Sequence, residues 1–312
     1  MKNEKIEEDI NQICSEHKLK EPELFDPPRG VTGCIFYSAK VSDQKSQPVM
    51  IKIGYEPRAK EEILANNRTY ELMENLGLCE HSPFLYSGEN YTVMKDLRGL
   101  LFVDIIKESK DPIQTYETLF DNLRKIYVQT LHKNKQKGKD AFTCVFGDEI
   151  QGRYFKDYLL PSGLVGDSEL KKLATLQSKV SQLPLEFVAF GTGGEMKPTD
   201  LYLEDGNLIY LDLREPNYIS PLIELSILSE LFKVHKLPAA EKGYELTHEL
   251  IEELVHQVGL SERDSGILVN LGKLRQGTLS ARFRVNDNRA EAEENARKAV
   301  ESIEEILRAV GS

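Results

Sequence analysis

The hydrophobic pattern of this chain changes near residue 100, and that change constrains the fold more than any other feature. Before it, short runs rich in β-branched and aromatic residues predict antiparallel strands, and apolar residues at helical spacing predict helices. The predicted strands are 34–41, 48–54, 83–88 and 91–97, and the predicted helices are 3–18 and 58–76. The first part of the chain is therefore expected to form a small antiparallel sheet with helical cover.

Beyond residue 100 the pattern is mainly helical, with one interruption. Residues 201–213 form two alternating runs around Asp205-Gly206, which is a strong signal for a tight β-hairpin. The later predicted helices are 220–235, 244–258 and 289–310. We therefore predict an α+β fold with two lobes. Residues 1–98 make a small antiparallel lobe, and residues 99–312 make a larger helical lobe that contains the hairpin.

Composition excludes several functions. A chain of 312 residues is longer than a typical single domain, which agrees with two lobes. The net charge of -11 argues against general nucleic-acid binding, which needs a surplus of basic residues.

The four cysteines are scattered without a CxxC pair, as expected in a reducing cytoplasm. The charged N-terminus does not resemble a signal peptide, and no apolar run approaches the ~20 residues of a membrane span. We expect a cytoplasmic protein without a membrane partner.

Two features of the first lobe carry residue types that contact phosphate. Gly30 and Gly33 precede the first predicted hairpin, where a missing Cβ lets backbone amides approach a phosphate, although ordinary turns also use glycine. Lys52 lies inside an apolar strand, and burying an ammonium group is unfavourable unless it meets an anion. The next helix offers Glu61 and Glu62 as partners, unless the lysine extends its ammonium group to solvent.

The end of the last predicted strand of this lobe is a third candidate feature. Residues 91–97 form an apolar strand that becomes polar at its end, so the backbone from Lys95 to Leu97 is positioned to meet the edge of an adenine ring. A plain strand end has the same pattern.

Three acidic residues surround the predicted hairpin of the second lobe. Glu195 and Asp200 lie five residues apart before the hairpin, and Asp212 lies at its end. In phosphoryl transfer one carboxylate positions the attacking hydroxyl group, and others hold magnesium, a hard cation that prefers oxygen ligands. Three surface acids beside a turn would give the same spacing.

Taken in order along residues 20–235, these features resemble the protein-kinase-like superfamily, specifically its aminoglycoside phosphotransferase and choline kinase branch. In that family the catalytic loop reads roughly His-Gly-Asp-x-x-x-x-Asn. Here Gly193-Gly194-Glu195 stands where His-Gly-Asp is expected, and Asp200 stands at the Asn position.

The segments around and after the loop extend the resemblance. Pro198 matches a proline common in the family's loop, and Leu211-Asp212 matches the strand end that carries its metal-binding aspartate. In the helix that follows, Glu224 stands where the family usually has aspartate.

The resemblance implies an ATP- and Mg²⁺-dependent kinase that phosphorylates a hydroxyl group of a small molecule. It implies catalytic roles for Glu195 and Asp212, metal binding by Asp200 and Asp212, and nucleotide binding by Gly30, Gly33, Lys52, Glu62, Lys95 and Leu97. Asn66 competes with Glu62 for the place of the family's lysine partner, depending on how the helix is aligned.

The altered loop leaves other functions open. Glu195 is one methylene longer than aspartate, and a displacement of about 1 Å can reduce a rate on the order of 10²-fold. The first hypothesis is an active small-molecule phosphotransferase. The second is a catalytically weak or inactive kinase-like module that binds nucleotide or another protein. The third is an unrelated α+β enzyme or binding module.

Overall fold

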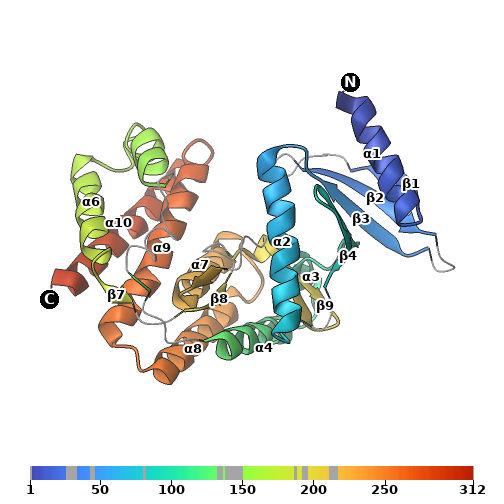
Figure 1. Cartoon of the computed structure of the whole chain (residues 1–312). Coiled ribbons are helices and arrows are strands. Elements are labelled where there is room, and N and C mark those ends of the chain that lie inside the picture. The colour runs from blue at the N-terminus through green and yellow to red at the C-terminus, as the bar shows by residue number, and fades with distance from the viewer. Residues whose placement is uncertain are drawn as a thin grey trace. The chain divides into compact units, whose positions relative to one another are not determined.

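The computed structural model describes residues 2–25, 34–42, 46–79, 82–131, 136–137, 150–185, 188–191, 196–210 and 217–311 (Figure 1). The chain divides into two compact units. The first contains residues 1–101 and 208–216, and the second contains residues 102–207 and 217–312.

The first unit is built on a five-stranded sheet with the strand order β1-β2-β3-β5-β4. Its strands are β1 (Leu19–Leu24), β2 (Ile35–Val41), β3 (Pro48–Ile53), β4 (Phe84–Ser87) and β5 (Tyr91–Lys95). All neighbouring strands are antiparallel, which confirms the predicted sheet and its first hairpin. Strand β1 was not predicted, because Leu19 is its only buried residue.

Helices cover opposite faces of this sheet (Figure 1). The helix α1 (Lys2–Glu16) packs against alternate residues of β3, among them the fully buried Ile51. The other face meets α2 (Pro57–Asn75), whose Ala59 and Ile63 pack with Cys34. Because side chains alternate along a strand, Lys52 points to the face that α2 covers.

The second unit is mainly helical. Its helices are α3 (Phe102–Glu108), α4 (Pro112–Thr130), the π-helix η1 (Ile150–Leu159), α6 (Asp167–Val180), α7 (Pro221–Val234), α8 (Ala240–Val258), α9 (Glu262–Arg284) and α10 (Arg289–Gly311). Short strands pair as β6 (Gln136–Lys137) with β7 (Pro184–Leu185), and β8 (Ala189–Gly191) with β11 (Asn217–Ile219). The predicted helices at 220–235, 244–258 and 289–310 are confirmed.

The hairpin predicted at Asp205-Gly206 is confirmed as β9 (Leu201–Glu204) and β10 (Asn207–Tyr210). Both turn residues have positive φ, 50° at Asp205 and 82° at Gly206, as a two-residue turn that matches strand twist requires. The expected division at residue 98 stays a prediction. Residues 208–216 group with the first unit, and the N–H of Tyr210 on β10 donates to the Tyr70 hydroxyl group on α2.

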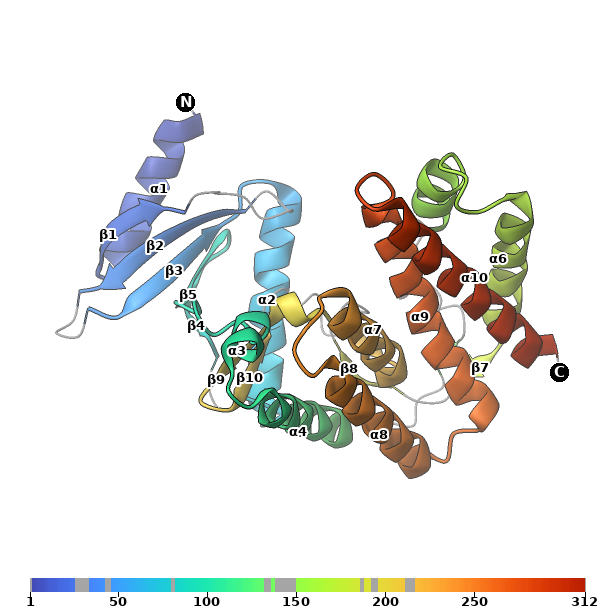
Figure 2. The same cartoon turned by 180° about the vertical axis from the view of Figure 1, so that it is seen from behind.

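Helix α9 was not predicted, and its packing explains why. It lies between α7 and α10 (Figure 2), so it is buried on two sides and its sequence lacks a single apolar stripe. Two glycines allow the close approach. A Cβ at Gly272 would stand 2.6 Å from the carbonyl oxygen of Ile223 on α7, and one at Gly277 would stand 2.9 Å from that of Asn295 on α10.

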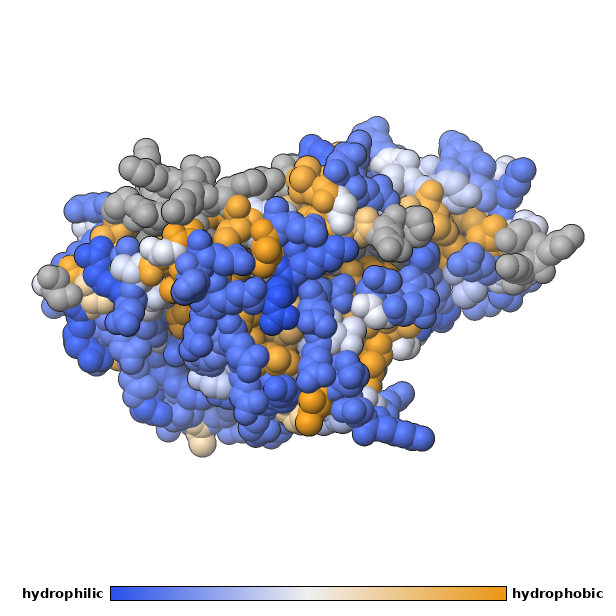
Figure 3. Space-filling view, turned by 90° about the horizontal axis from the view of Figure 1, so that it is seen from below, coloured by the Kyte–Doolittle hydropathy of each residue, from blue (hydrophilic) through white to orange (hydrophobic). Residues whose placement is uncertain are grey.

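Hydrophilic residues cover most of the face seen in Figure 3. Among the described residues, no helix is both long enough and apolar enough to cross a membrane.

Two glycines of α9 give a matched test of this packing. We expect Gly272→Ala to lower the free energy of unfolding by about 1–3 kcal/mol, because its methyl group would overlap the backbone of α7. Gly266→Ala, where no atom lies within 4 Å of the added Cβ, should instead raise it by about 0.5–1 kcal/mol. Urea unfolding measures both. Equal effects of the two substitutions would contradict the close packing of α9 on α7.

Candidate active site

Lys52 and Glu62 form an ion pair inside the first unit. The ammonium group of Lys52 on β3 donates a hydrogen bond to Oε1 of Glu62 on α2, and each side chain is only 12% exposed. The Lys52 Nζ also lies 5.8 Å from the centre of the Phe36 ring. A buried pair of this kind holds a cation at a fixed place on the sheet, where it can meet a further anion.

The other possible partners of Lys52 lie elsewhere. Glu61 is exposed. Asn66 is buried one turn along α2, and its side-chain amide donates to the carbonyl oxygen of Glu62 at 3.0 Å. The structure therefore contains the pair with Glu62, which is the partner expected from the sequence, while its role in nucleotide binding stays a prediction.

The segment after β5 presents a backbone donor. Leu97 is buried, its carbonyl oxygen accepts a hydrogen bond from Leu100 N–H at 3.0 Å, and its own N–H has no acceptor among the described residues. The N–H of Lys95 is already bonded to the carbonyl oxygen of Pro83 at 2.9 Å. Leu97 thus offers an N–H group of the kind that an adenine edge accepts.

An ion pair stabilises the turn at this segment. Arg98 donates from its guanidinium group and from its backbone N–H to Asp96. Burial acts to raise the pKa of the Asp96 carboxyl group, but the hydrogen bonds and charge of Arg98 outweigh burial and lower it. Asp96 is therefore held as a carboxylate that fixes the backbone on either side of Leu97.

A tyrosine ties α2 to the strand that leads toward Asp212. The buried hydroxyl group of Tyr70 donates to the carbonyl oxygen of Tyr210 and accepts from the N–H of Tyr210 at 2.9 Å. Burial raises the pKa of Tyr70 well above its ordinary value, so the hydroxyl group keeps the proton that it donates. Both residues belong to the first unit, and Tyr210 precedes Asp212 by two positions.

Asp200 lies in the second unit, on a short 3₁₀ turn, η2 (Pro198–Asp200), directly before β9. Its backbone N–H donates to the carbonyl oxygen of Lys197 at 3.0 Å, and its carboxylate is 3.8 Å from the Lys197 ammonium group. Beside it, burial raises the pKa of Tyr202, and the charges of Asp200 and Asp104 add to that rise. The Asp200 side chain is 29% exposed.

The loop before this turn starts from a rigid base. Gly191 ends β8, and the carboxylate of Glu224 on α7 is completely buried against it. A Cβ at position 191 would stand 2.6 Å from Glu224 Oε2 and 2.8 Å from Ile219 Cγ1, so a larger residue there would require these side chains to shift. The Tyr127 hydroxyl group donates to the same oxygen at 3.2 Å, and Phe190 N–H donates to the Thr130 hydroxyl group at 2.9 Å.

The remaining predicted site residues, Gly30, Gly33, Glu195 and Asp212, lie outside the described residues. Within the described ranges no cluster of three or more His, Cys, Asp or Glu side chains could hold a metal ion. The expected convergence of Lys52, Asp200 and Asp212 on one site therefore stays a prediction.

Sequence reasoning missed the residues that support the site. In the sequence Tyr70 is one position of the helix predicted at 58–76, and although a buried tyrosine hydroxyl group usually finds a partner, no local pattern indicates which one. Tyr127 and Thr130 gave no signal, because their partners are distant in sequence: Glu224 on α7 is 97 positions from Tyr127, and Phe190 on β8 is 60 positions from Thr130. Glu224 was noted by resemblance, without its buried contact to Gly191.

The structure combines two features: an antiparallel sheet joined to its helix α2 by the Lys52–Glu62 ion pair, and a mainly helical part with a β-hairpin. The fold is protein-kinase-like, in the form found in the aminoglycoside phosphotransferase and choline kinase branch. This confirms the predicted fold class and the resemblance in fold.

Three solved structures illustrate the likeness. An amicoumacin kinase in complex with AMP-PNP and Ca²⁺ is 13% identical, with a TM-score of 0.55 over 91% of this chain and 88% of that one. The choline kinase LicA from Streptococcus pneumoniae is 14% identical, with a TM-score of 0.53 over 97% and 98%. A type VIII aminoglycoside-3'-phosphotransferase is 11% identical, with a TM-score of 0.51 over 81% and 93%. No family model matches the sequence, and no curated protein matches it. The likeness is therefore one of fold.

Removing one hydroxyl group tests the tie between α2 and β10. We expect Tyr70→Phe to lower the free energy of unfolding by about 1–3 kcal/mol, because both buried hydrogen bonds to Tyr210 are lost. Tyr86→Phe is the matched control, because Tyr86 is 40% exposed and should change stability by less than about 0.5 kcal/mol. Denaturant unfolding of the two variants compares them, and similar small losses would contradict the structural role of Tyr70.

Proposed function

We propose that this protein is an ATP-dependent phosphotransferase that acts on a hydroxyl group of a small molecule. The observation that carries the proposal is the buried Lys52–Glu62 pair in a fold shared with small-molecule kinases. A buried lysine held by a glutamate on the neighbouring helix is the arrangement that kinases use to contact nucleotide phosphates.

The nucleotide would be held by the first unit. Lys52 contacts the α- and β-phosphates while Glu62 keeps its ammonium group in place. The Leu97 N–H meets the adenine edge, with the backbone of Lys95 beside it. In this proposal the amides near Gly30 and Gly33 approach the phosphates.

Asp200 and Asp212 are the proposed ligands of Mg²⁺. A partly exposed carboxylate on a fixed turn suits a cation that binds through oxygen and keeps several of its waters. The Tyr70 contact supports the second ligand, because it fixes the strand that precedes Asp212. Glu195 orients the acceptor hydroxyl group and accepts its proton, and ATP supplies the phosphoryl group.

The altered loop favours one alternative, a kinase-like module that binds nucleotide with little or no catalysis. Gly193-Gly194-Glu195 replaces the family's His-Gly-Asp, so the acid that orients the acceptor is longer than usual. Binding by Lys52 and Leu97 does not depend on that loop, whereas turnover does.

The first test is the loss of turnover in Asp212→Asn. We expect the variant to keep the melting temperature of the wild-type protein and to lose phosphoryl transfer, because it lacks one negative charge on the proposed metal site. The measurement is ATP-dependent product formation across a panel of small hydroxyl-bearing compounds. Unchanged turnover in Asp212→Asn would refute its assignment.

The second test measures nucleotide binding by thermal shift. Mg-ATP at 100 times its Kd should add about 2.7 kcal/mol of stability, and Lys52→Met should abolish that gain. Lys40→Met is the control, because Lys40 is a strand lysine paired with a glutamate on the same sheet but is half exposed. A shift without turnover favours the alternative function, and the absence of any shift contradicts both.

A further inference from the structure

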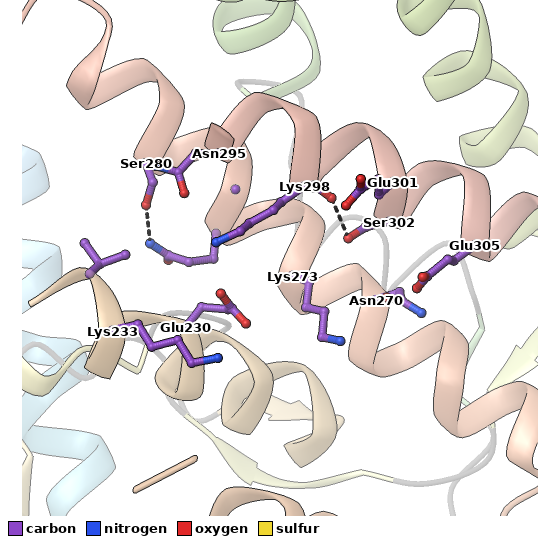
Figure 4. Close-up of a pocket in the computed structure, with 13 residues that line it drawn as sticks. Glu230, Lys233, Asn270, Lys273, Ser280, Asn295, Lys298, Glu301, Ser302 and Glu305 are labelled. Carbon is purple, nitrogen blue, oxygen red and sulfur yellow. Dashed lines mark hydrogen bonds between the residues drawn. The ribbon is translucent and has the colours of Figure 1, made fainter. Parts of the chain in front are cut away.

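A polar cavity lies in the helical unit, and none of the residues assigned above lines it. It encloses about 230 Å³ between the end of α7 and the middle of α9 and α10 (Figure 4). Val234 is its only lining residue with a purely hydrocarbon side chain. The contact of α7 with β8 involves Glu224, near the other end of the helix, so the cavity is separate from the base of the loop that precedes Asp200.

The floor of the cavity consists of buried polar side chains with unused hydrogen-bonding capacity. Gln276 is 7% exposed and donates to the Ser280 hydroxyl group at 2.8 Å. Asn295 is 9% exposed and donates to the carbonyl oxygen of Glu291 at 2.9 Å. The side-chain oxygens of both amides accept no hydrogen bond from the described residues.

A third amide beside the cavity, that of Asn270, also has unused hydrogen-bonding capacity. The side-chain oxygen of Asn270 is buried and has no hydrogen-bond partner among the described residues, while its nitrogen donates to the carbonyl oxygen of Gly266 at 3.0 Å. Buried polar atoms in proteins are almost always paired. The unpaired oxygen of Asn270, beside a cavity that two further amides line, therefore indicates a ligand that brings hydrogen-bond donors.

Ammonium groups surround the opening. Figure 4 shows Lys233, Lys273 and Lys298 extending around the carboxylate of Glu230. Lys273 has no ion-pair partner in the described part of the chain, and Lys233 only lies 3.9 Å from the centre of the Tyr244 ring. Lys298 has one long contact, 3.8 Å to Glu294.

One of the acids that line the cavity already has an ion pair. Arg297 pairs with Glu301, and also with Glu294. The three ammonium groups therefore share the cavity with two carboxylates, those of Glu230 and Glu305, that make no ion pair with the described residues. Lysine is a common ligand of phosphate groups, which it meets as a compact point charge.

We propose that this cavity binds a small phosphomonoester that also carries hydroxyl groups. The three lysines meet the phosphate, and Glu230 with the amide oxygens of Asn270 and Gln276 accepts hydrogen bonds from the hydroxyl groups. The inference goes beyond the proposed phosphotransferase activity, because it uses none of the residues assigned to that activity and requires no nucleotide.

The test measures binding of glucose 6-phosphate by calorimetry on the full chain without nucleotide. Glucose and inorganic phosphate each supply half of the proposed chemistry, so each should bind at least tenfold more weakly than the ester. Lys273→Ala and Lys298→Ala should each weaken binding of the ester at least tenfold. Lys125→Ala is the control, because Lys125 is an exposed lysine of α4 outside the cavity, and it should bind as the wild-type protein does.

A further variant separates recognition from folding. Asn270→Ala removes an unpartnered buried oxygen, so the ligand-free protein should be at least as stable as wild type while its affinity for the ester falls about fivefold. No saturable binding of the ester, binding that survives Lys273→Ala, or equal affinity for inorganic phosphate would each overturn the proposal. Asp212→Asn should bind the ester normally, so failure of the proposed enzyme activity leaves this result unchanged.

Discussion

An ammonium group inside a sheet is unfavourable unless an anion meets it, and in the first unit one contact satisfies this requirement. The Lys52–Glu62 pair joins β3 to α2 at a fixed point. Two turns further along the same helix, Tyr70 holds the backbone of Tyr210. A single helix thus sets the distance between the lysine and the strand that leads to Asp212. The sheet, the helix and the end of the hairpin are joined by these two polar contacts.

Much of the fold could be predicted because many of its elements follow from the local spacing of apolar residues or from turn residues. The hairpin of β2 and β3, the helix α2 and the turn at Asp205-Gly206 each follow from a pattern within about twenty residues. The elements that were missed lack such a pattern. Strand β1 has one buried residue and exists because it completes the edge beside β2. Helix α9 is buried on two sides, so polar and small residues such as Gln276 occupy positions where an amphipathic pattern would show apolar ones.

How much of the candidate site could be predicted differs from residue to residue. A charged residue in an apolar strand already demands a partner, so Lys52 could be identified from its immediate neighbours. The choice between Glu61 and Glu62 depends on the phase of α2, which one residue changes by about 100°. The contact between Tyr70 and Tyr210 spans 140 positions, and no local pattern carries that information. Contacts of this kind support a site but belong to no sequence motif. This explains why Lys52 could be identified from the sequence and the contact between Tyr70 and Tyr210 could not.

The contacts of Glu224 before the loop that carries Glu195 help to choose between the two proposed functions, an active phosphotransferase and a nucleotide-binding module with little or no catalysis. Burying the Glu224 carboxylate completely costs free energy, and the chain accommodates it with a hydroxyl donor on α4 and with a glycine where a larger residue would require neighbouring side chains to shift. By resemblance, glutamate stands at both 195 and 224 where aspartate is expected, so each of these two side chains is one methylene longer. Burying an acid beside this loop lowers the stability of the fold, and a loop without a function would give no compensating benefit. The buried Glu224 is therefore an argument for the proposed phosphotransferase activity over the alternative of a module with little or no catalysis.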